Sequence, residues 1–301
     1  MKITYIEQPC KNLLHKITKT NLPFSWGVNP YRGCLHSCTY CYARYTHSYL
    51  DLNTTEDFDT KIIVKTNAAK VLRKEFSKPN WQKELVNLGS VCDPYQPAER
   101  KYEITREILQ VFKQFRNPII IATKSDLILR DIEILRDISK VTFIDILFSI
   151  SSIRKDAQRE LEPRAPSTQR RLEAIKQLHD AGLRVGVLAI PIVPFINDTP
   201  AEIEELYEAI MNTQADFVIP GVLYIQGPTK KRFMDYIEIQ HPELLTQYKE
   251  LYKGRSPPKN YRDDMRTLFQ KLIKKYQLNN YQKYQQDAVP KQVSLENYIK
   301  K

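Results

Sequence analysis

Three cysteines, Cys34, Cys38 and Cys41, lie within eight residues and have the spacing Cys-x3-Cys-x2-Cys. Pro30 and Gly33 precede them, which indicates a loop rather than a packed element. A loop can direct three thiolates toward one point, and soft thiolates select zinc, copper(I) or iron-sulfur clusters. Ordinary buried cysteines are the alternative, but core cysteines have no reason to gather among polar and aromatic residues. The spacing therefore predicts a metal centre.

The identity of the metal depends on the fourth ligand, which this motif does not supply. Structural zinc has four protein ligands, usually arranged in pairs. Cys10 and Cys92 each stand alone, and His36 and His47 could complete a zinc site but lack the usual paired spacing. A 4Fe-4S cluster held by three cysteines instead leaves one iron open to another ligand, and an open iron is a reactive position. Zinc and iron-sulfur both stay open on spacing alone.

Aromatic residues flank the third cysteine, Tyr40 before it and Tyr42 after it. Cys-x3-Cys-x-aromatic-Cys resembles the signature of radical S-adenosylmethionine (SAM) enzymes. In that family three cysteines hold a 4Fe-4S cluster whose open iron binds the amino and carboxylate groups of SAM. An electron from a reductase, flavodoxin or ferredoxin then cleaves SAM to methionine and a 5'-deoxyadenosyl radical, which abstracts hydrogen from a substrate. The resemblance implies that Cys34, Cys38 and Cys41 bind this cluster.

Apolar runs alternate with amphipathic stretches along most of the chain, which predicts alternating strands and helices. We expect strands at 24–28, 61–65, 85–91, 118–122, 141–150, 184–190 and 217–225, and helices at 67–76, 98–115, 126–138, 166–181 and 200–211. Gly182 is a C-cap residue, while Thr199 and Pro200 mark a helix start.

Six strand-helix units indicate a parallel sheet with helices outside it. Right-handed crossovers would curl this α/β chain into a partial (β/α)6 barrel of the TIM type, as in radical SAM enzymes. Active sites of such barrels lie at the C-terminal ends of the strands, where the cysteine loop follows strand 24–28. We expect a core over residues 1–228, with a lead-in over about residues 1–20, and a helical C-terminal segment over 229–301.

A dense polar motif, Asp93-Pro94-Tyr95-Gln96-Pro97-Ala98-Glu99, follows the strand expected at 85–91. Together with the cysteine loop it resembles the spore photoproduct lyase family, over about residues 20–278. Further matches are Thr123-Lys124-Ser125, Phe148-Ser149-Ile150-Ser151, Leu161-Glu162-Pro163-Arg164 and the run from Pro191 to Asp198.

This resemblance implies which residues hold SAM: Tyr40, Tyr42, Asp93, Lys124 and Ser149. Lys124 suits the carboxylate of SAM, and Asp93 suits its ammonium or a hydroxyl. A surface lysine that reaches solvent is the alternative for Lys124.

Other residues of the matched segments have weaker assignments. The backbone near Ile192 and Val193 could flank the adenine. Arg164 could bind a carboxylate or phosphate, or it could pair with Glu162.

The chain departs from the lyases at the residue that returns hydrogen to the product. Lyases carry a cysteine near the end of the second strand, where Ser90 stands here. Cys92 lies two residues on, a shift that keeps the same face of a strand. Cys92 and Tyr42 are therefore the catalytic candidates, although Cys92 could simply line the SAM pocket.

The net charge of +11 is concentrated near the C-terminus, where residues 229–301 hold 16 Lys and Arg against 8 Asp and Glu. Eight tyrosines are interleaved there: Tyr236, Tyr248, Tyr252, Tyr261, Tyr276, Tyr281, Tyr284 and Tyr298. Cations beside aromatic rings suit DNA or RNA, and a solvated lysine-rich surface is the alternative. We expect a nucleic-acid substrate, in lesion repair or nucleic-acid modification.

Two other functions stay open: a radical SAM enzyme acting on a protein or small molecule, and a non-catalytic metal-binding or electron-transfer protein. Five cysteines with three bunched together favour a reducing compartment. The chain has no apolar N-terminal run and no stretch near the length that spans a membrane, so we expect a cytoplasmic protein without membrane contact.

Overall fold

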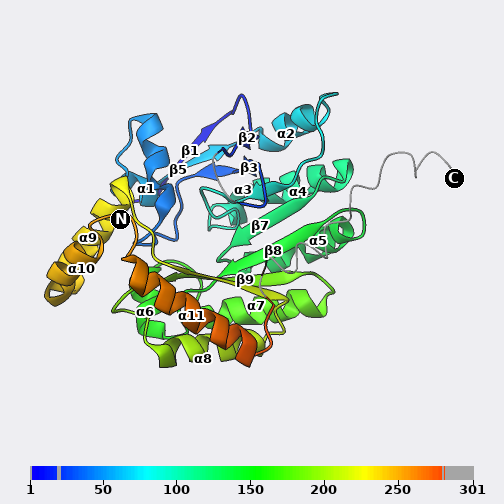
Figure 1. Ribbon diagram of the computed structural model, residues 1–301. Helices are drawn as coiled ribbons and strands as arrows, with labels where there is room; N and C mark the ends of the chain where they lie inside the picture. Colours follow the sequence, from blue (N-terminus) through cyan, green and yellow to red (C-terminus); the bar gives the residue numbers. More distant parts are fainter. Residues whose placement is uncertain (1, 19–21, 280, 282–301) are drawn as a thin grey trace.

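The main sheet of the protein has seven strands in the order β10-β9-β8-β7-β6-β3-β2 (Figure 1). The computed structural model describes residues 2–18, 22–279 and 281. Six strands are parallel: β3 (Trp26–Val28), β6 (Val86–Leu88), β7 (Ile119–Thr123), β8 (Ile144–Ser149), β9 (Val185–Ile192) and β10 (Phe217–Val222). β2 (His15–Lys16) pairs antiparallel with β3 at one edge, and β10 forms the other edge. The predicted partial (β/α)6 barrel is confirmed.

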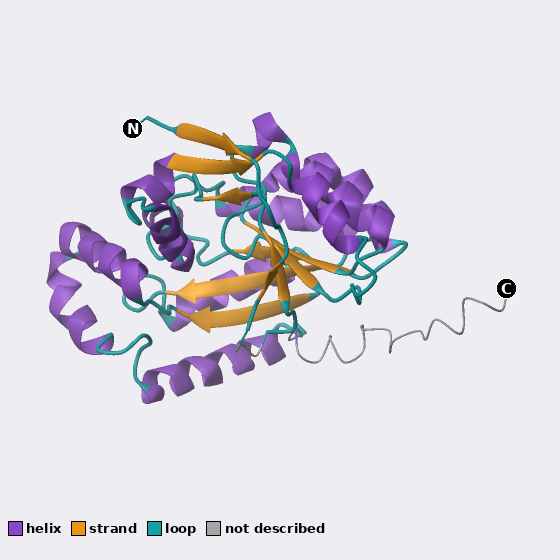
Figure 2. Cartoon of the chain, turned by 90° about the horizontal axis from the view of Figure 1, so that it is seen from above, coloured by secondary structure: helices purple, strands orange, loops and turns teal. Residues whose placement is uncertain are grey.

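Helices lie outside the strands in the turned view (Figure 2). The core helices are α2 (Ala68–Phe76), α3 (Glu99–Tyr102), α4 (Ile104–Phe115), η2 (Asp126–Asp131), α5 (Ile132–Ser139), α6 (Lys155–Leu161), α7 (Thr168–Asp180) and α8 (Pro200–Met211). The single helix predicted at 98–115 is broken at Glu103, whose φ is 50°. The helix at 200–211 has the predicted bounds, because Thr199 and Glu202 form a capping box at its start.

The strand predicted at 61–65, β5 (Lys61–Lys65), lies outside the barrel. It pairs with β1 (Thr4–Gln8) and β4 (Tyr31–Arg32) in a separate three-stranded sheet. The cysteine loop runs from β4 into η1 (Tyr42–Leu50), and α1 (Glu56–Thr60) leads into β5. This small sheet thus supports the beginning of the cysteine loop.

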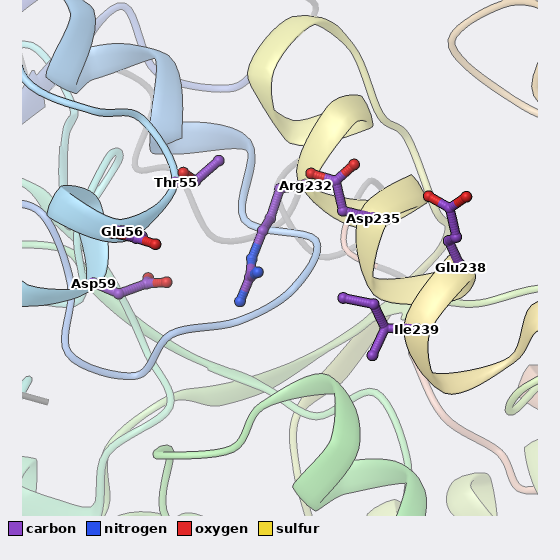
Figure 3. A pocket seen from close by; sticks show the side chains of 7 residues that line it. All are labelled: Thr55, Glu56, Asp59, Arg232, Asp235, Glu238 and Ile239. Carbon is purple, nitrogen blue, oxygen red and sulfur yellow. The ribbon is translucent and has the colours of Figure 1, made fainter.

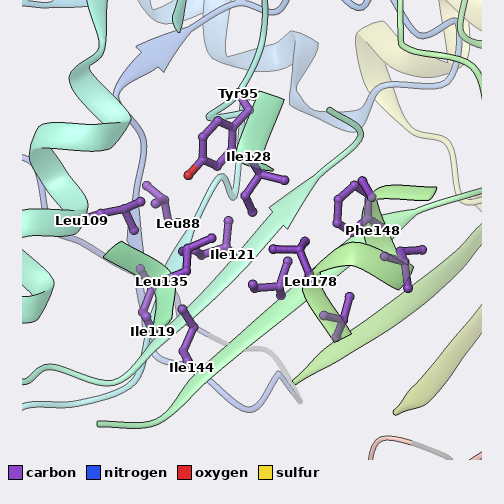
Figure 4. Close-up of a cluster of buried hydrophobic side chains, with 14 of the residues drawn as sticks. Leu88, Tyr95, Leu109, Ile119, Ile121, Ile128, Leu135, Ile144, Phe148 and Leu178 are labelled. Carbon is purple, nitrogen blue, oxygen red and sulfur yellow. The ribbon is translucent and has the colours of Figure 1, made fainter. Parts of the chain in front are cut away.

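The hydrophobic core fills the space between the sheet and its surrounding helices (Figure 4). Ile121, Phe148 and Leu178 have no exposed surface, and the six residues of β8 are all buried. Strands buried on both faces read as continuous apolar runs, which is why the sequence revealed them.

Only helices follow β10 in the described chain: α9 (Gly227–Gln240), η3 (Pro242–Leu244), α10 (Leu245–Leu251) and α11 (Lys259–Lys275). α11 packs on α8 and β10. Tyr236, Tyr248, Tyr252 and Tyr281 are buried, so their rings do not form the expected surface for stacking on bases. Tyr284 and Tyr298 lie outside the described residues. Within the described ranges, no helix is long and apolar enough to cross a membrane.

Candidate active site

The backbone of the cysteine loop is held by its neighbours on two sides. Gly33 has a φ of +84°, and a Cβ there would come within 3.0 Å of two backbone carbonyls, so glycine fits this close turn. Gln96 donates to the Gly33 carbonyl at 3.0 Å and accepts from the Leu35 amide at 3.0 Å. The motif around Gln96 thus binds the loop directly.

Further side chains hold the loop near its second and third cysteines. The buried Arg44 donates to the Cys38 carbonyl at 2.9 Å and pairs with Asp59 at 3.0 Å. Thr229, at the start of α9, donates to the Cys41 carbonyl at 2.8 Å. The C-terminal helices therefore contribute to the site as well as to the fold.

The surroundings of the three thiols in this loop oppose their ionisation in the absence of a bound cation. Burial raises the pKa of Cys34, Cys38 and Cys41, to about 12 for Cys38. Their thiolates also repel one another, which raises the pKa of Cys34 further. Iron would supply the positive charge that buried thiolates need, so this donor set fits an iron-sulfur cluster. Among the described residues, no group of three or more His, Cys, Asp or Glu is arranged to hold a single metal ion.

The two histidines considered as zinc ligands are both engaged elsewhere. His36 Nδ1 lies 3.3 Å from Asp93 Oδ2. His47 Nε2 lies 3.1 Å from the Lys61 carbonyl oxygen, and its ring packs on Phe58. His36 therefore ties the cysteine loop to the motif that follows β6.

Asp93 lies at the centre of contacts between three loops. Its carboxylate accepts from the amides of Tyr95 at 2.9 Å and Lys124 at 2.7 Å, and from the Thr123 hydroxyl at 2.7 Å. Burial opposes its charge, but His36 and these donors hold the pKa of Asp93 below its usual value. Four partners occupy the roughly four lone-pair sites of a carboxylate.

Lys124 extends from the end of β7 toward Ser149 and Tyr40. Its Nζ donates to Ser149 Oγ at 2.7 Å and lies 5.7 Å from the centre of the Tyr40 ring. The fully buried carboxylate of Glu162 lies 3.8 Å from Lys124 Nζ and accepts from the Tyr40 hydroxyl. Three of the predicted SAM residues thus lie together, and Asp93 joins them through the Lys124 backbone.

Glu162 has a second cationic partner that the sequence did not reveal. Arg171, on α7 and without exposed surface, lies 2.5 Å from Glu162 Oε2 and donates to the Ser149 carbonyl at 2.9 Å. Glu162 thus pairs with Arg171 and with Lys124. Burial opposes the charge on Lys124, yet Glu162 raises the pKa of Lys124.

Comparison with known proteins agrees with this arrangement. The profile of the radical SAM superfamily matches residues 28–210. The chain belongs to the radical SAM superfamily. Membership brings two cofactors, a 4Fe-4S cluster and SAM, and makes the chain an enzyme.

The relatives span several kinds of organism. An uncharacterized protein of Mycobacterium tuberculosis is 38% identical over 278 residues, covering 92% of this chain and 82% of the relative. An uncharacterized protein of Methanocaldococcus jannaschii is 26% identical over 257 residues, covering 83% and 88%. One from Acidianus two-tailed virus is 27% identical over 282 residues, covering 92% and 86%.

Solved structures show the same fold. Spore photoproduct lyase complexed with dinucleoside spore photoproduct has a TM-score of 0.69 at 14% identity, covering 91% of this chain and 79% of that chain. Streptococcus suis SuiB bound to the precursor peptide SuiA has a TM-score of 0.53 at 17% identity, covering 86% and 48%.

Of the two catalytic candidates, Cys92 belongs to the loop that follows β6, and Tyr42 contacts this loop. The Tyr42 side chain is exposed, and its hydroxyl donates to the Ser90 carbonyl. Cys92 is buried, with Sγ 3.7 Å from Asn29 Oδ1. Because β6 ends at Leu88, Ser90 and Cys92 are loop residues, and the prediction that they share one face of a strand is wrong. Their catalytic role stays a prediction.

The end of β9 and the residues that follow it are buried and held by a local side-chain contact. Ile192 and Val193 are fully buried, and the Val193 amide donates to Asn197 Oδ1 at 2.6 Å. The Arg164 amide donates to the His36 carbonyl at 3.3 Å, which joins the segment after α6 to the cysteine loop. A role in binding adenine or an anion stays a prediction for these residues.

A hollow of about 500 Å³ lies between α1 and α9, on the Asp59 side of the cysteine loop (Figure 3). Its lining comprises Thr55, Glu56, Asp59, Arg232, Asp235, Glu238 and Ile239. Asp59 connects the hollow to the loop, because it pairs with the Arg44 that holds the Cys38 carbonyl. None of the predicted SAM residues lines this hollow.

Proposed function

We propose that Cys34, Cys38 and Cys41 bind the cluster and that SAM binds beside them against Lys124 and Ser149. The observation that carries this proposal is the charge of the buried network next to Cys38. Lys124 and Arg171 are two cations, and Glu162 is their shared anion. Among these three side chains the cations outnumber the anion, and a buried cation without a counter-ion of its own favours an anionic ligand.

Lys124 is the member of this network that can reach a ligand. Its side chain is 16% exposed, whereas Glu162 and Arg171 are fully buried. An ammonium has three donors, and one of them is used by Ser149. The carboxylate of SAM fits the remaining donors and would neutralise the excess charge.

The bound cofactors supply a radical that abstracts hydrogen from the substrate. Tyr42 and Cys92 are the residues proposed to handle hydrogen near that reaction. Burial raises the pKa of Cys92 to about 12, so its thiol keeps the hydrogen that a donor needs. The Ser90 hydroxyl accepts from Asn29 Nδ2 at 2.8 Å, and an O–H group is a poor substitute for a thiol in this role.

The first test measures release of 5'-deoxyadenosine from anaerobically reconstituted protein given SAM and dithionite. Wild-type protein is expected to release it, and Cys38→Ala is expected to release none. Equal release by both proteins would refute the assignment of the cluster ligands. Protein with an intact cluster but no release calls for the same assay with candidate substrates.

The second test measures the affinity for SAM. Lys124→Met should weaken binding roughly 10- to 100-fold, because a hydrogen bond to a charged group contributes about 1.5–3 kcal/mol. Lys140→Met is the control, since the Lys140 side chain is 65% exposed and pairs only with Asp137 among the described contacts. Equal Kd values for both variants would refute the role of Lys124.

The proposed substrate is a nucleic acid, as in lesion repair or nucleic-acid modification. Two findings support it: the excess of basic residues over 229–301, and the likeness in fold to a lyase complexed with a dinucleoside photoproduct. Because four of the described C-terminal tyrosines are buried, the support from this segment comes from its charge and not from ring stacking. The proposed electron donor is a reductase, flavodoxin or ferredoxin.

Deleting residues after Thr229 would be a poor test of nucleic-acid binding, because Phe233 and Phe269 belong to the core. Lys271→Glu on the exposed side of α11 is cleaner. It should weaken binding of DNA or RNA, whereas Lys78→Glu on the surface after α2 should not. Affinity should fall steeply with salt. Absence of binding at low salt would refute the nucleic-acid substrate and favour a peptide or small molecule.

A further inference from the structure

A closed ring of contacts joins the cysteine loop to the ends of two strands. The Tyr40 hydroxyl donates to Glu162, and Glu162 lies 2.5 Å from Arg171. Arg171 then donates to the Ser149 carbonyl at 2.9 Å, and Ser149 Oγ accepts from Lys124 at 2.7 Å. Lys124 completes the ring, because its Nζ lies 5.7 Å from the centre of the Tyr40 ring and 3.8 Å from Glu162.

Glu162 is the only carboxylate in this ring of five residues, and it contacts three of the other four. One oxygen faces both Tyr40 and Lys124, while the other faces Arg171. The side chains of Glu162 and Arg171 are fully buried, so water screens their charges little. A change in the charge of Glu162 would therefore act strongly on its surroundings.

The ring lies next to the second cysteine. Tyr40 is two residues from Cys38, and the Leu161 carbonyl beside Glu162 accepts from the Thr39 amide at 3.0 Å. Lys124, Glu162 and Arg171 all act electrostatically on Cys38. The potential of an iron-sulfur cluster is set by the net charge around it, by hydrogen bonds and by exposure.

We infer that Glu162 is a positioning residue that orients Tyr40 and Lys124 and sets the charge beside the cluster, lowering its reduction potential. This inference rests on the proposed function, because it takes Cys38 as a cluster ligand. A carboxylate near the cluster disfavours the added electron, whereas Lys124 and Arg171 favour it. The ring thus places opposing charges on one side of the loop.

The test is a redox titration of the cluster signal by electron paramagnetic resonance, in reconstituted protein without SAM. Glu162→Gln keeps the shape of the side chain and removes its charge, so the potential should shift upward. Glu162→Asp keeps the charge and should stay nearer to the wild-type value. A purely structural role would lower the melting temperature in both variants without separating their potentials.

Lys124→Met removes a positive charge from the same ring, whereas Glu162→Gln removes a negative one. The Lys124 side chain reaches the surface, so the variant should fold even if Glu162→Gln does not. Its potential should shift downward. Unchanged potentials in a folded variant, or a shift of opposite sign, would overturn the inference. Wild-type protein that assembles no 4Fe-4S signal would instead refute the proposed function, and with it the inference.

Discussion

Replacing Gln96 with methionine should loosen the cysteine loop without opening a cavity. Methionine has nearly the shape of glutamine, but it neither donates to the Gly33 carbonyl nor accepts from the Leu35 amide. Both contacts measure 3.0 Å, and Gln96 has no exposed surface. The two backbone groups would therefore be left buried without these partners.

Each buried group without a partner costs about 1–3 kcal/mol, so Gln96→Met should lower the free energy of unfolding by roughly 2–6 kcal/mol. Because the lost contacts lie on both sides of Cys34, we also expect fewer irons per chain after anaerobic reconstitution. Urea unfolding of the apo protein measures the first effect, and iron and sulfide analysis measures the second.

Gln114→Met is the matched control, because Gln114 is exposed and accepts only from the Arg73 side chain among the described contacts. Exposed substitutions of this kind usually change stability by no more than about 0.5 kcal/mol. If Gln96→Met were as stable as this control and carried full iron, Gln96 would not hold the loop.

Three further outcomes follow from the described contacts. The pKa of Asp93 is lowered, so its contribution to stability is present above the ordinary carboxyl pKa and is lost as pH falls through the lowered value. Urea unfolding at pH 7 and pH 3 should therefore show that Asp93→Asn loses less free energy of unfolding in acid than wild type does. Cys92→Ala should bind as much iron as wild type, and loss of iron would make Cys92 part of the cluster site. Thr199→Ala should lower stability by about 1 kcal/mol because it removes a capping box, and an unchanged melting temperature would contradict this.

The barrel strands could be predicted from the sequence because they are short, apolar and bounded by turn residues. The sequence could not show that β5 lies outside the barrel, because an apolar run such as Ile62-Ile63-Val64 indicates burial but not the strands that it pairs with. Pairing with β1 and β4 depends on contacts far apart in sequence. The strands β2 and β4 have two residues each, which is too few to show a period.

In the candidate site, residue type and spacing predict Cys34, Cys38 and Cys41 as the cluster ligands, and this assignment stays a prediction. Arg171 could not be found in this way, because it lies within an amphipathic helix where arginine is common. Only the fold shows that its side chain faces inward to Glu162 and Ser149. For the C-terminal tyrosines the sequence was misleading. Their interleaving with lysine suggested exposed rings, but most of the described rings are buried in the core.

The resemblance implies that Asp93 and Lys124 both bind SAM, but their contacts lead us to expect different roles for the two residues. Asp93 already has four protein partners, so a ligand could reach its oxygens only by displacing one of them. Lys124 has unused donors beside an excess positive charge. Asp93→Asn should therefore weaken SAM binding through misplacement of the Lys124 backbone, and Lys124→Met through loss of the contact itself. In the double variant the two effects should not add, because a misplaced backbone costs little once the ammonium is gone. Additive losses in Kd would show that Asp93 contacts SAM on its own account.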